Sequence, residues 1–349
     1  MLGAPSDSIG RTDSEAANGP LKSIVIIIDY FGTWPEWFPV FLASCRRNPT
    51  IRWHLHTDCP IPDGHPPNVE FFSMTFDEYR RRVGVALDLS LDDCIEPYKI
   101  CEIRTASGVV FEDEIRGFDY FGYGDLDVVY GDIRRFYDGH VLSHDVISTH
   151  EWCTSGHLLL MKNSLALRRA FERVQRWREF FTSKRRYRFD EDIFRWVFKR
   201  PEQLGVGTPL SGEFEHEFNI DDAQARAYVA ARGTPLPSEI DIDPALQANN
   251  YFKEQFSTPL TPFRWHNGSR QHPEVWFWKD GRVTNALDGA REFLYLHFMN
   301  FVKPKALSRR YAAAPWSGSR IMHIDAKDID TCGVRIDFQG IHPLDVTPV

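Results

Sequence analysis

The stretch from Gly117 to Asp132 constrains the fold most. An aromatic and apolar run there ends in the sequence Gly-Asp-Leu-Asp, which predicts a buried strand that reaches the edge of a sheet. In an extended chain, residues two apart point to the same side, so Asp125 and Asp127 face one way while Leu126 turns back toward the core. Two neighbouring carboxylates bind a hard cation, and oxygen ligands favour Mg²⁺ or Mn²⁺. The stretch therefore predicts a divalent metal site at the sheet edge.

Three further Asp-x-Asp triplets occur in this acidic chain, so the pattern alone has little specificity. They lie in polar surroundings typical of helix or loop surface: Asp190/Asp192, Asp241/Asp243 and Asp328/Asp330. The pair at 125 and 127 differs from them because it follows an apolar strand and is flanked by glycines. A solvated turn is the alternative interpretation of this pair.

The composition is that of an ordinary globular protein with a substantial core. The chain has 349 residues, of which 42% are hydrophobic and 14% aromatic. A net charge of −8 argues against a general nucleic-acid binder. We interpret the basic run Lys184–Arg188 as a solvated helix end, which leaves contact with a phosphate or peripheral association with a membrane surface open.

Cysteine spacing and hydropathy indicate the cellular compartment that we expect for the protein. The six cysteines show no Cys-x-x-Cys spacing and no zinc-finger pairing with His, which predicts reduced thiols and a cytoplasmic location. No apolar stretch approaches the length of a membrane span, and the first residues lack the apolar centre of a signal peptide. We therefore expect no transmembrane segment and a disordered tail over residues 1–21.

The order of elements after this tail predicts an α/β sheet. The β-branched run Ser23–Gly32 is typical of a central strand covered on both faces. A helix over residues 35–45, strands over 51–58 and 69–74, and a helix capped by Thr75 follow with short links. Ligands of open α/β sheets gather at the carboxyl ends of the strands.

Candidate nucleotide-binding residues lie at the carboxyl end of the first predicted strand. Tyr30, Phe31 and Gly32 stand at its carboxyl end, where a nucleotide base and ribose could bind. The alternative is that the two aromatic rings cap the core.

A helix predicted over residues 96–113 leads into the strand before the acidic pair. It carries Lys99 and Arg104 one to two turns apart, so these cations either reach a diphosphate above the strand ends or share a solvated face.

Two later segments add polar candidates. Ser155, Gly156 and His157 precede an apolar strand, and Gly156 would let the backbone approach a sugar closely because it carries no Cβ. A long helix is predicted over residues 165–181.

Asp190 and Glu191 then open an amphipathic helix predicted over residues 188–197. Acids in a first turn complement the helix dipole, which is one interpretation of the two residues. The other is that one of them binds an acceptor hydroxyl or acts as a catalytic base.

The last third of the chain is less periodic. Residues 201–270 are rich in Pro, Gly and Asp, and we interpret them as an acceptor-side region. A hairpin over residues 276–283 turns at Asp280-Gly281, and a last core strand over 291–298 carries His297, which by itself indicates a hydrogen-bonded core residue.

These patterns divide the chain into segments. We expect an α/β core over residues 22–200, the acceptor-side region and closing strands over 201–314, and a C-terminal extension over 315–349, which either adds a small β element or lies loosely on the surface.

A set of motifs in this order resembles a known group. The motifs share aromatic, glycine and acidic residues at the predicted strand ends: Tyr30-Phe31-Gly32 with Pro35 and Trp37-Phe38, Ser44-Cys45 with Asn48, Thr57-Asp58, Pro97-Tyr98-Lys99, Gly122 with Gly124-Asp125-Leu126-Asp127, Gly131-Asp132-Ile133, Ser155-Gly156-His157 and Phe189-Asp190-Glu191. Over residues 23–200, and again near His297, the chain resembles a bacterial family of proposed glycosyltransferases first described as a domain of unknown function. It is similar to the metal-dependent nucleotide-sugar glycosyltransferases of GT-A fold.

The resemblance implies a single GT-A-like (Rossmann-like) domain with a mixed central sheet flanked by helices. It implies that Asp125 and Asp127 hold the donor diphosphate through Mn²⁺ or Mg²⁺, and it makes His297 a candidate third ligand. The chain departs from the family pattern after His297, in the sequence Phe298–Lys303, and at position 102, where Glu stands in place of Asp.

The function implied is transfer of a sugar from a nucleoside-diphosphate sugar, with a UDP-sugar as the favoured donor, to a glycan or other hydroxyl acceptor in polysaccharide or glycoconjugate synthesis. Two alternatives stay open: a metal-dependent nucleotidyl or phosphoryl transferase, and a non-catalytic sugar-nucleotide binding module. The first is weakened because the chain has no Gly-x-x-x-x-Gly-Lys-Ser/Thr loop to cradle a triphosphate.

Overall fold

The structure is a computed structural model that describes residues 20–94, 96–199, 240–261, 264–302, 316–317 and 320–344. Nearly all of the tail predicted over residues 1–21 lies outside these ranges, as does the stretch 201–239 of the predicted acceptor-side region.

A mixed β-sheet forms the centre of the described chain. Its seven strands have the order β3-β2-β1-β4-β7-β6-β8. Their bounds are β1 Ile24–Asp29, β2 Ile51–Thr57, β3 Val69–Ser73, β4 Tyr120–Gly124, β6 Val146–Ser148, β7 Leu158–Lys162 and β8 Asn250–Phe252. Strand β7 runs antiparallel to β4 and β6, and the other neighbours are parallel. The carboxyl ends of β1, β4, β6 and β8 therefore share one edge with the amino end of β7.

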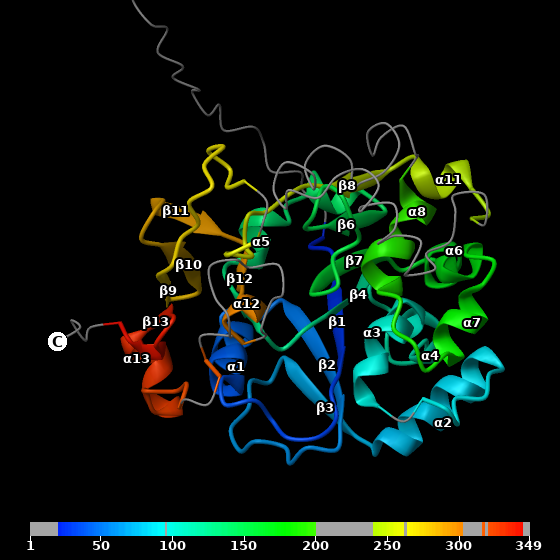
Figure 1. Ribbon diagram of the computed structural model, residues 1–349, viewed down its shortest axis with the longest axis horizontal. Coiled ribbons are helices and arrows are strands. Elements are labelled where there is room, and N and C mark those ends of the chain that lie inside the picture. The colour runs from blue at the N-terminus through cyan, green and yellow to red at the C-terminus, as the bar shows by residue number, and fades with distance from the viewer. Residues whose placement is uncertain are drawn as a thin grey trace, which may run out of the picture.

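Strand β1 is buried on both faces, as its β-branched run predicts. Val25 and Ile27 pack into a cluster with the helices of one face, whereas Ile24, Ile26 and Ile28 pack into a cluster on the other face. Figure 1 shows the sheet between these two layers, with α2, α3, α4, α6, α7 and α8 on one side and α1 on the other.

The helical segments are mostly short. Their bounds are α1 Phe38–Arg46, α2 Phe76–Leu87, η1 Pro97–Lys99, α3 Ile100–Ile103, η2 Arg104–Ala106, α4 Ser107–Val110, α5 Ile133–Phe136, η3 Val141–Ser143, α6 Leu165–Arg168, η4 Ala170–Arg173, α7 Trp177–Thr182, η5 Phe189–Ile193, α8 Arg195–Phe198, α11 Pro244–Gln247, α12 Met299–Val302, η8 Ala326–Asp328 and α13 Ile329–Cys332. Thr75 caps α2, as predicted, and Glu78 completes a capping box with it.

Two smaller sheets complete the described β structure. One has the order β11-β10-β9-β13-β14 and the other pairs β12 with β5. Their bounds are β5 Val128–Tyr130, β9 Trp276–Lys279, β10 Arg282–Asn285, β11 Gly289–Phe293, β12 Tyr295–His297, β13 Val334–Asp337 and β14 Gly340–Pro343. The predicted hairpin is β9–β10, and β13 and β14 show that part of the C-terminal extension is a β element.

Three predicted continuous elements are divided in the structure: the helix over residues 165–181, the strand over 291–298 and the helix over 96–113. The long helix predicted over residues 165–181 is divided into α6, η4 and α7, because Val174 leaves the helix to pair with Ile240. The strand predicted over 291–298 is divided at Leu294, because β11 pairs with β10 while β12 pairs with β5. Nor is β12 the last strand of the described chain, because β13 and β14 follow it.

The helix predicted over residues 96–113 is a succession of short turns from η1 to α4, and the helix predicted over 188–197 begins with a π-helical turn, η5. Among the described residues, no helix has the length and apolar character needed to cross a membrane.

A buried histidine joins the first two strands. His56 of β2 lies between Asp29 and Glu114, with 2.7 Å from Nδ1 to Asp29 Oδ1 and 2.7 Å from Nε2 to Glu114 Oε2. Its ring is fully buried and stacks on Phe111. Burial opposes protonation, but the hydrogen bonds to the two carboxylates outweigh it and raise the pKa of His56 above its ordinary value.

This raised pKa predicts a pH-dependent part of the stability. The contribution of protonated His56 is present in full below its unfolded-state pKa of about 6.5 and is lost as the pH rises through the higher folded-state pKa. The difference in free energy of unfolding between the wild type and His56→Gln should therefore shrink as the pH is raised from 6 to 9, measured by urea denaturation. His144→Gln is the control, and a constant difference would contradict the prediction.

Gly122 gives a second prediction, because β4 and β7 pass each other where a side chain has no room. A Cβ at position 122 would lie 2.0 Å from the backbone oxygen of Leu159. Gly122→Ala should lower the free energy of unfolding by about 1–3 kcal/mol or more. Gly139→Ala, which meets nothing within 4 Å, is the matched control. Equal denaturation midpoints for the two variants would show that the strands can separate without cost.

Candidate active site

The acidic pair lies in the short connection between β4 and β5. Leu126 is buried, and its backbone oxygen accepts a hydrogen bond from Trp37 Nε1 at 3.0 Å. The backbone N–H of Asp125 donates to the carbonyl of His157 at 3.3 Å. These contacts fix the connection at the carboxyl edge of the central sheet, where the sequence predicts it.

Strand pairing brings His297 beside the pair. In the β5–β12 ladder His297 lies opposite Val128, and the N–H of Phe298 donates to the carbonyl of Asp127 at 3.0 Å. The candidate ligand atoms of Asp125, Asp127 and His297 all lie within 4.8 Å of one another. His297 Nε2 is 3.6 Å from Asp127 Oδ1.

The surroundings of His297 suit a metal ligand. Thr258 Oγ1 lies 3.1 Å from His297 Nδ1, so the hydroxyl can accept a hydrogen bond from Nδ1–H, which leaves Nε2 as the lone-pair nitrogen on the side of Asp127. The two carboxylates supply the oxygen donors that suit Mn²⁺ or Mg²⁺, and the imidazole adds a nitrogen donor of the kind that divalent transition metals take. The residues present therefore fit a divalent cation.

A second histidine supports the first. The His157 ring stacks on His297 with 3.9 Å between ring centroids, and its Nε2 lies 2.6 Å from Tyr295 Oη and 3.2 Å from Ser155 Oγ. Burial, followed by the neighbouring His297, holds the pKa of His157 well below its ordinary value. Ser155 and His157 are buried, so they serve as packing beneath the site.

Arg104 links the acidic pair to the other predicted acids. Its Nη1 lies 2.7 Å from Asp125 Oδ1, and its Nε lies 3.0 Å from Asp190 Oδ2. Nη1 also donates to the carbonyl of Gly156. Burial works against the charge, yet Asp125 and the other nearby groups raise the pKa of Arg104 well above its ordinary value.

Glu102 holds the segment that carries Asp190 and Glu191. Its fully buried carboxylate accepts three consecutive backbone N–H groups, at 2.7, 2.9 and 3.2 Å, from residues 187–189. Arg188 has φ +55° there, a left-handed conformation that a non-glycine residue rarely adopts. The Glu at position 102 therefore fixes the start of η5.

Gly156 makes room for the two acids. A Cβ at position 156 would lie 2.9 Å from Asp190 Oδ2 and 3.0 Å from Glu191 Oε1. The side chains of Asp190 and Glu191, and not a sugar, therefore occupy the space beside Gly156.

The two acids have different environments. Asp190 is buried, and burial raises its pKa well above the ordinary value. Burial also opposes ionisation of Glu191, but Arg188 outweighs it and lowers the pKa of Glu191 to about 2. The Glu191 side chain is 27% exposed, so it is the one of the two that a substrate can meet.

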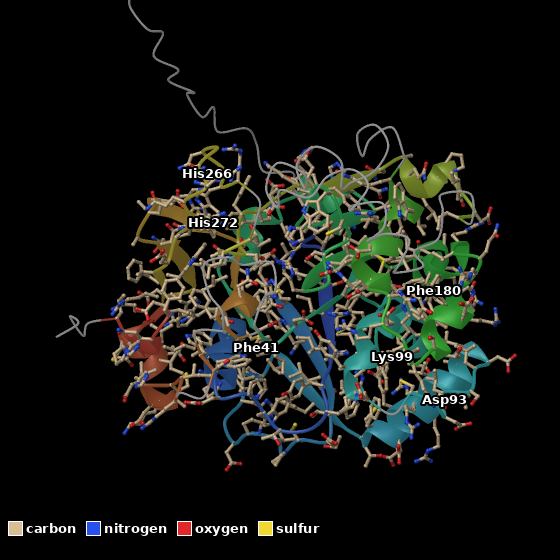
Figure 2. The ribbon with its side chains drawn as sticks, viewed as in Figure 1. Phe41, Asp93, Lys99, Phe180, His266 and His272 are labelled. Atoms are coloured by element: carbon tan, nitrogen blue, oxygen red, sulfur yellow. The ribbon has the colours of Figure 1, made fainter. Side chains whose placement is uncertain are left out.

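Lys99 lies apart from this group. Its buried ammonium donates to the carbonyls of Phe180 at 2.7 Å and Arg185 at 2.8 Å, and Figure 2 labels Lys99 and Phe180 on the helical side of the sheet. Burial lowers the pKa of Lys99. The structure gives this residue the role of an internal anchor.

The residues after β1 divide into exposed and buried ones. Tyr30 is partly exposed, stacks on Trp34 and donates its hydroxyl to the carbonyl of Thr33 at 2.7 Å. Phe31 is buried against Phe76 and Tyr79, so it belongs to the core. Gly32 is exposed with φ +121°, and its N–H donates to Asp58. Tyr30 and Gly32 are thus the accessible pair.

Sequence reasoning missed Thr258. Thr258 lies in the weakly periodic region, far from the motifs in the sequence. Only the folded structure brings it to His297, so no sequence pattern indicates its role. Glu102 was visible as a departure from the family pattern, but the sequence did not indicate its three backbone partners.

Comparison with known proteins identifies the family of the chain. Residues 26–229, more than half of the chain, match the family described as "Family of unknown function (DUF6625)". The chain belongs to this family. The DUF6625 match covers Asp125, Asp127, Asp190 and Glu191, whereas His297 lies beyond it. No curated protein matches the sequence.

Solved structures similar to the DUF6625 chain are described as glycosyltransferases. The galactosyltransferase LgtC, in complex with donor and acceptor sugar analogues, is 11% identical with a TM-score of 0.30, over 65% of this chain and 86% of its own. GlyE of Streptococcus pneumoniae TIGR4 is 10% identical with a TM-score of 0.26, over 45% and 39%. The bifunctional WbbM is 9% identical with a TM-score of 0.30, over 70% and 48%. Because these scores are low, a function has to be argued from the site residues.

The hydrogen bond that His297 Nδ1–H donates to Thr258 Oγ1 generates a prediction. Thr258→Val removes the hydroxyl and keeps the shape, so it should lower the affinity for Mn²⁺ about 10- to 100-fold, as losses of such supporting contacts do. Electron paramagnetic resonance of free Mn²⁺ during titration measures this. Thr182→Val, whose hydroxyl bonds to the backbone of α7, is the control. Equal affinities in both variants would remove His297 from the proposed metal site.

Proposed function

We propose that the chain is a metal-dependent glycosyltransferase that moves a sugar from a nucleoside-diphosphate sugar to a hydroxyl acceptor. The observation that carries the proposal is the group of Asp125, Asp127 and His297 at the carboxyl edge of a mixed α/β sheet. Such edges are where α/β proteins bind nucleotides. We place the reaction in polysaccharide or glycoconjugate synthesis, with a UDP-sugar as the favoured donor.

Mn²⁺ or Mg²⁺ held by the three side chains would supply positive charge to the diphosphate leaving group. In the proposal, the partly exposed Tyr30 ring and the Gly32 backbone contact the nucleoside at the neighbouring strand end. Arg104 keeps Asp125 in place through the ion pair described above, and since its charge is shared with Asp190 it acts as a positioning residue.

Glu191 is the residue that we assign to the reacting sugars. It is ionised at neutral pH because Arg188 holds its pKa at about 2, and it lies beside Gly156 next to Arg104 and Asp190. In the overall reaction the acceptor oxygen bonds to the anomeric carbon, the bond from that carbon to the diphosphate oxygen breaks, and the hydroxyl proton leaves. An ionised carboxylate at this position can stabilise the developing positive charge of the sugar. Its low pKa makes it a weak base, so in the proposal the hydroxyl proton passes to the departing diphosphate.

Nucleotide-release assays test the proposal. The chain is incubated with a panel of nucleoside-diphosphate sugars, with and without Mn²⁺, and the released phosphates are identified. Metal-dependent release of nucleoside diphosphate supports a glycosyltransferase. Release of monophosphate or pyrophosphate would indicate phosphoryl or nucleotidyl transfer, and binding without turnover would indicate a sugar-nucleotide binding module.

Asp127→Ala should lower the metal-dependent release on the order of 100-fold or more while the fold persists, because a charge-stabilising group is lost. Asp241→Ala is the matched control, since Asp241 belongs to another Asp-x-Asp triplet and pairs with Arg173 on the surface. Circular dichroism checks the fold of both variants. Wild-type turnover in Asp127→Ala would rule out the metal role.

A further inference from the structure

A second polar group lies at the same sheet edge as the acidic pair. His150 follows β6 and Glu254 follows β8, and both strands run in the direction of β4. The two side chains therefore stand beyond the carboxyl ends of their strands, on the edge that carries Asp125. Nothing in the proposed donor site uses them.

The side chains of His150 and Glu254 are both partly exposed and contact each other. His150 Nδ1 lies 2.8 Å from Glu254 Oε2, with 13% and 23% of the side chains exposed. Glu254 Oε1 accepts the N–H of Phe256 at 3.1 Å. Burial opposes ionisation of Glu254, but His150 outweighs it and lowers the pKa. An ionised carboxylate has about four acceptor positions, so capacity remains for a ligand hydroxyl.

An aromatic ring stands next to this pair. The partly exposed ring of Trp152 lies 5.5 Å from that of His150. A flat apolar surface beside a fixed carboxylate and imidazole is suited to a ligand that has both C–H faces and hydroxyl groups. Carbohydrates have this chemistry.

The group is connected to the candidate metal centre. The His150 ring lies 5.1 Å from that of His157, which stacks on His297. Strands lie about 4.8 Å apart, so β6 stands about 10 Å from β4 across the sheet. With the diphosphate at β4, this separation leaves room for the donor sugar before the ends of β6 and β8 are reached.

We propose that Trp152, His150 and Glu254 form the acceptor subsite and that the acceptor is a carbohydrate, a pyranose ring lying on Trp152 with a hydroxyl bonded to Glu254. The assignment rests on the proposed glycosyltransferase function. The order along the sheet edge is then nucleoside at β1, diphosphate at β4, donor sugar over the start of β7 and acceptor at β6 and β8.

The test uses Trp152→Ala and Glu254→Gln in the full chain, with Glu292→Ala as the control because its carboxylate pairs with Arg135 outside the site. UDP release from a panel of UDP-hexoses with Mn²⁺ is measured with and without methyl glycosides of glucose, galactose, mannose and N-acetylglucosamine. We expect one glycoside to accelerate release in the wild type and to yield a disaccharide by mass spectrometry. Both variants should need about ten-fold or more of that glycoside for half-maximal effect, as expected for a lost hydrogen bond to a charged group or a lost stacking surface.

Saturation-transfer NMR of the same glycosides supplies a readout that needs no donor. Binding to the wild type and to Glu292→Ala, and weaker binding to the other two variants, supports the subsite. Unchanged glycoside dependence in both variants overturns it and leaves the glycosyltransferase proposal standing. A wild type that releases UDP but responds to no glycoside would likewise overturn the acceptor subsite and leave the glycosyltransferase proposal standing.

Two further outcomes separate the proposals. Loss of Mn²⁺ binding in Trp152→Ala would assign the segment to the metal centre and overturn the acceptor assignment. A wild type that releases no nucleoside diphosphate from any donor would overturn the proposed function and the acceptor subsite together.

Discussion

The buried charge of Arg104 is the constraint on which the site depends. Its side chain is 8% exposed, and an unpaired guanidinium at such a depth would cost several kcal/mol. Asp125 at the end of β4 lies against Nη1 and Asp190 in η5 lies against Nε, so the two acids are held around one cation from a third segment. Breaking either contact leaves a partner poorly compensated. The position of the acids is therefore coupled to the fold of the helical turns between η1 and α4.

The same run of turns anchors three parts of the chain in succession. Lys99 binds the carbonyls of residues 180 and 185, Glu102 binds the N–H groups of residues 187–189, and Arg104 binds Asp190. Each contact is a charged group meeting backbone dipoles or an opposite charge inside the protein, where such interactions are strong. The helical face of the sheet is thus connected to the site by electrostatics as well as by apolar packing.

The sequence was informative where the physics is local. The two-residue spacing at Asp125 and Asp127, the β-branched run of β1 and the cap at Thr75 are patterns of neighbouring residues, and the structure has the feature that each predicts. The α/β class with a mixed sheet is confirmed as well. The sequence left Phe31 open between a nucleotide contact and the core, and Lys99 open between a diphosphate contact and a solvated face, because a pattern cannot tell an exposed face from a buried one; the structure buries both side chains. The helix over 165–181 was wrong because Val174 pairs with a distant residue, and Thr258 could not be found since only folding brings it to His297.

The ladder between β5 and β12 has a consequence for biosynthesis. The two carboxylates leave the ribosome long before the imidazole that joins them, and the hydroxyl that orients this imidazole also comes late. A nascent or truncated chain that ends before β12 contains the whole acidic motif but lacks the nitrogen donor. The order of translation thus places the imidazole of the proposed metal site about 170 residues after its two carboxylates, so that the three side chains can meet only when β12 has been made and has paired with β5.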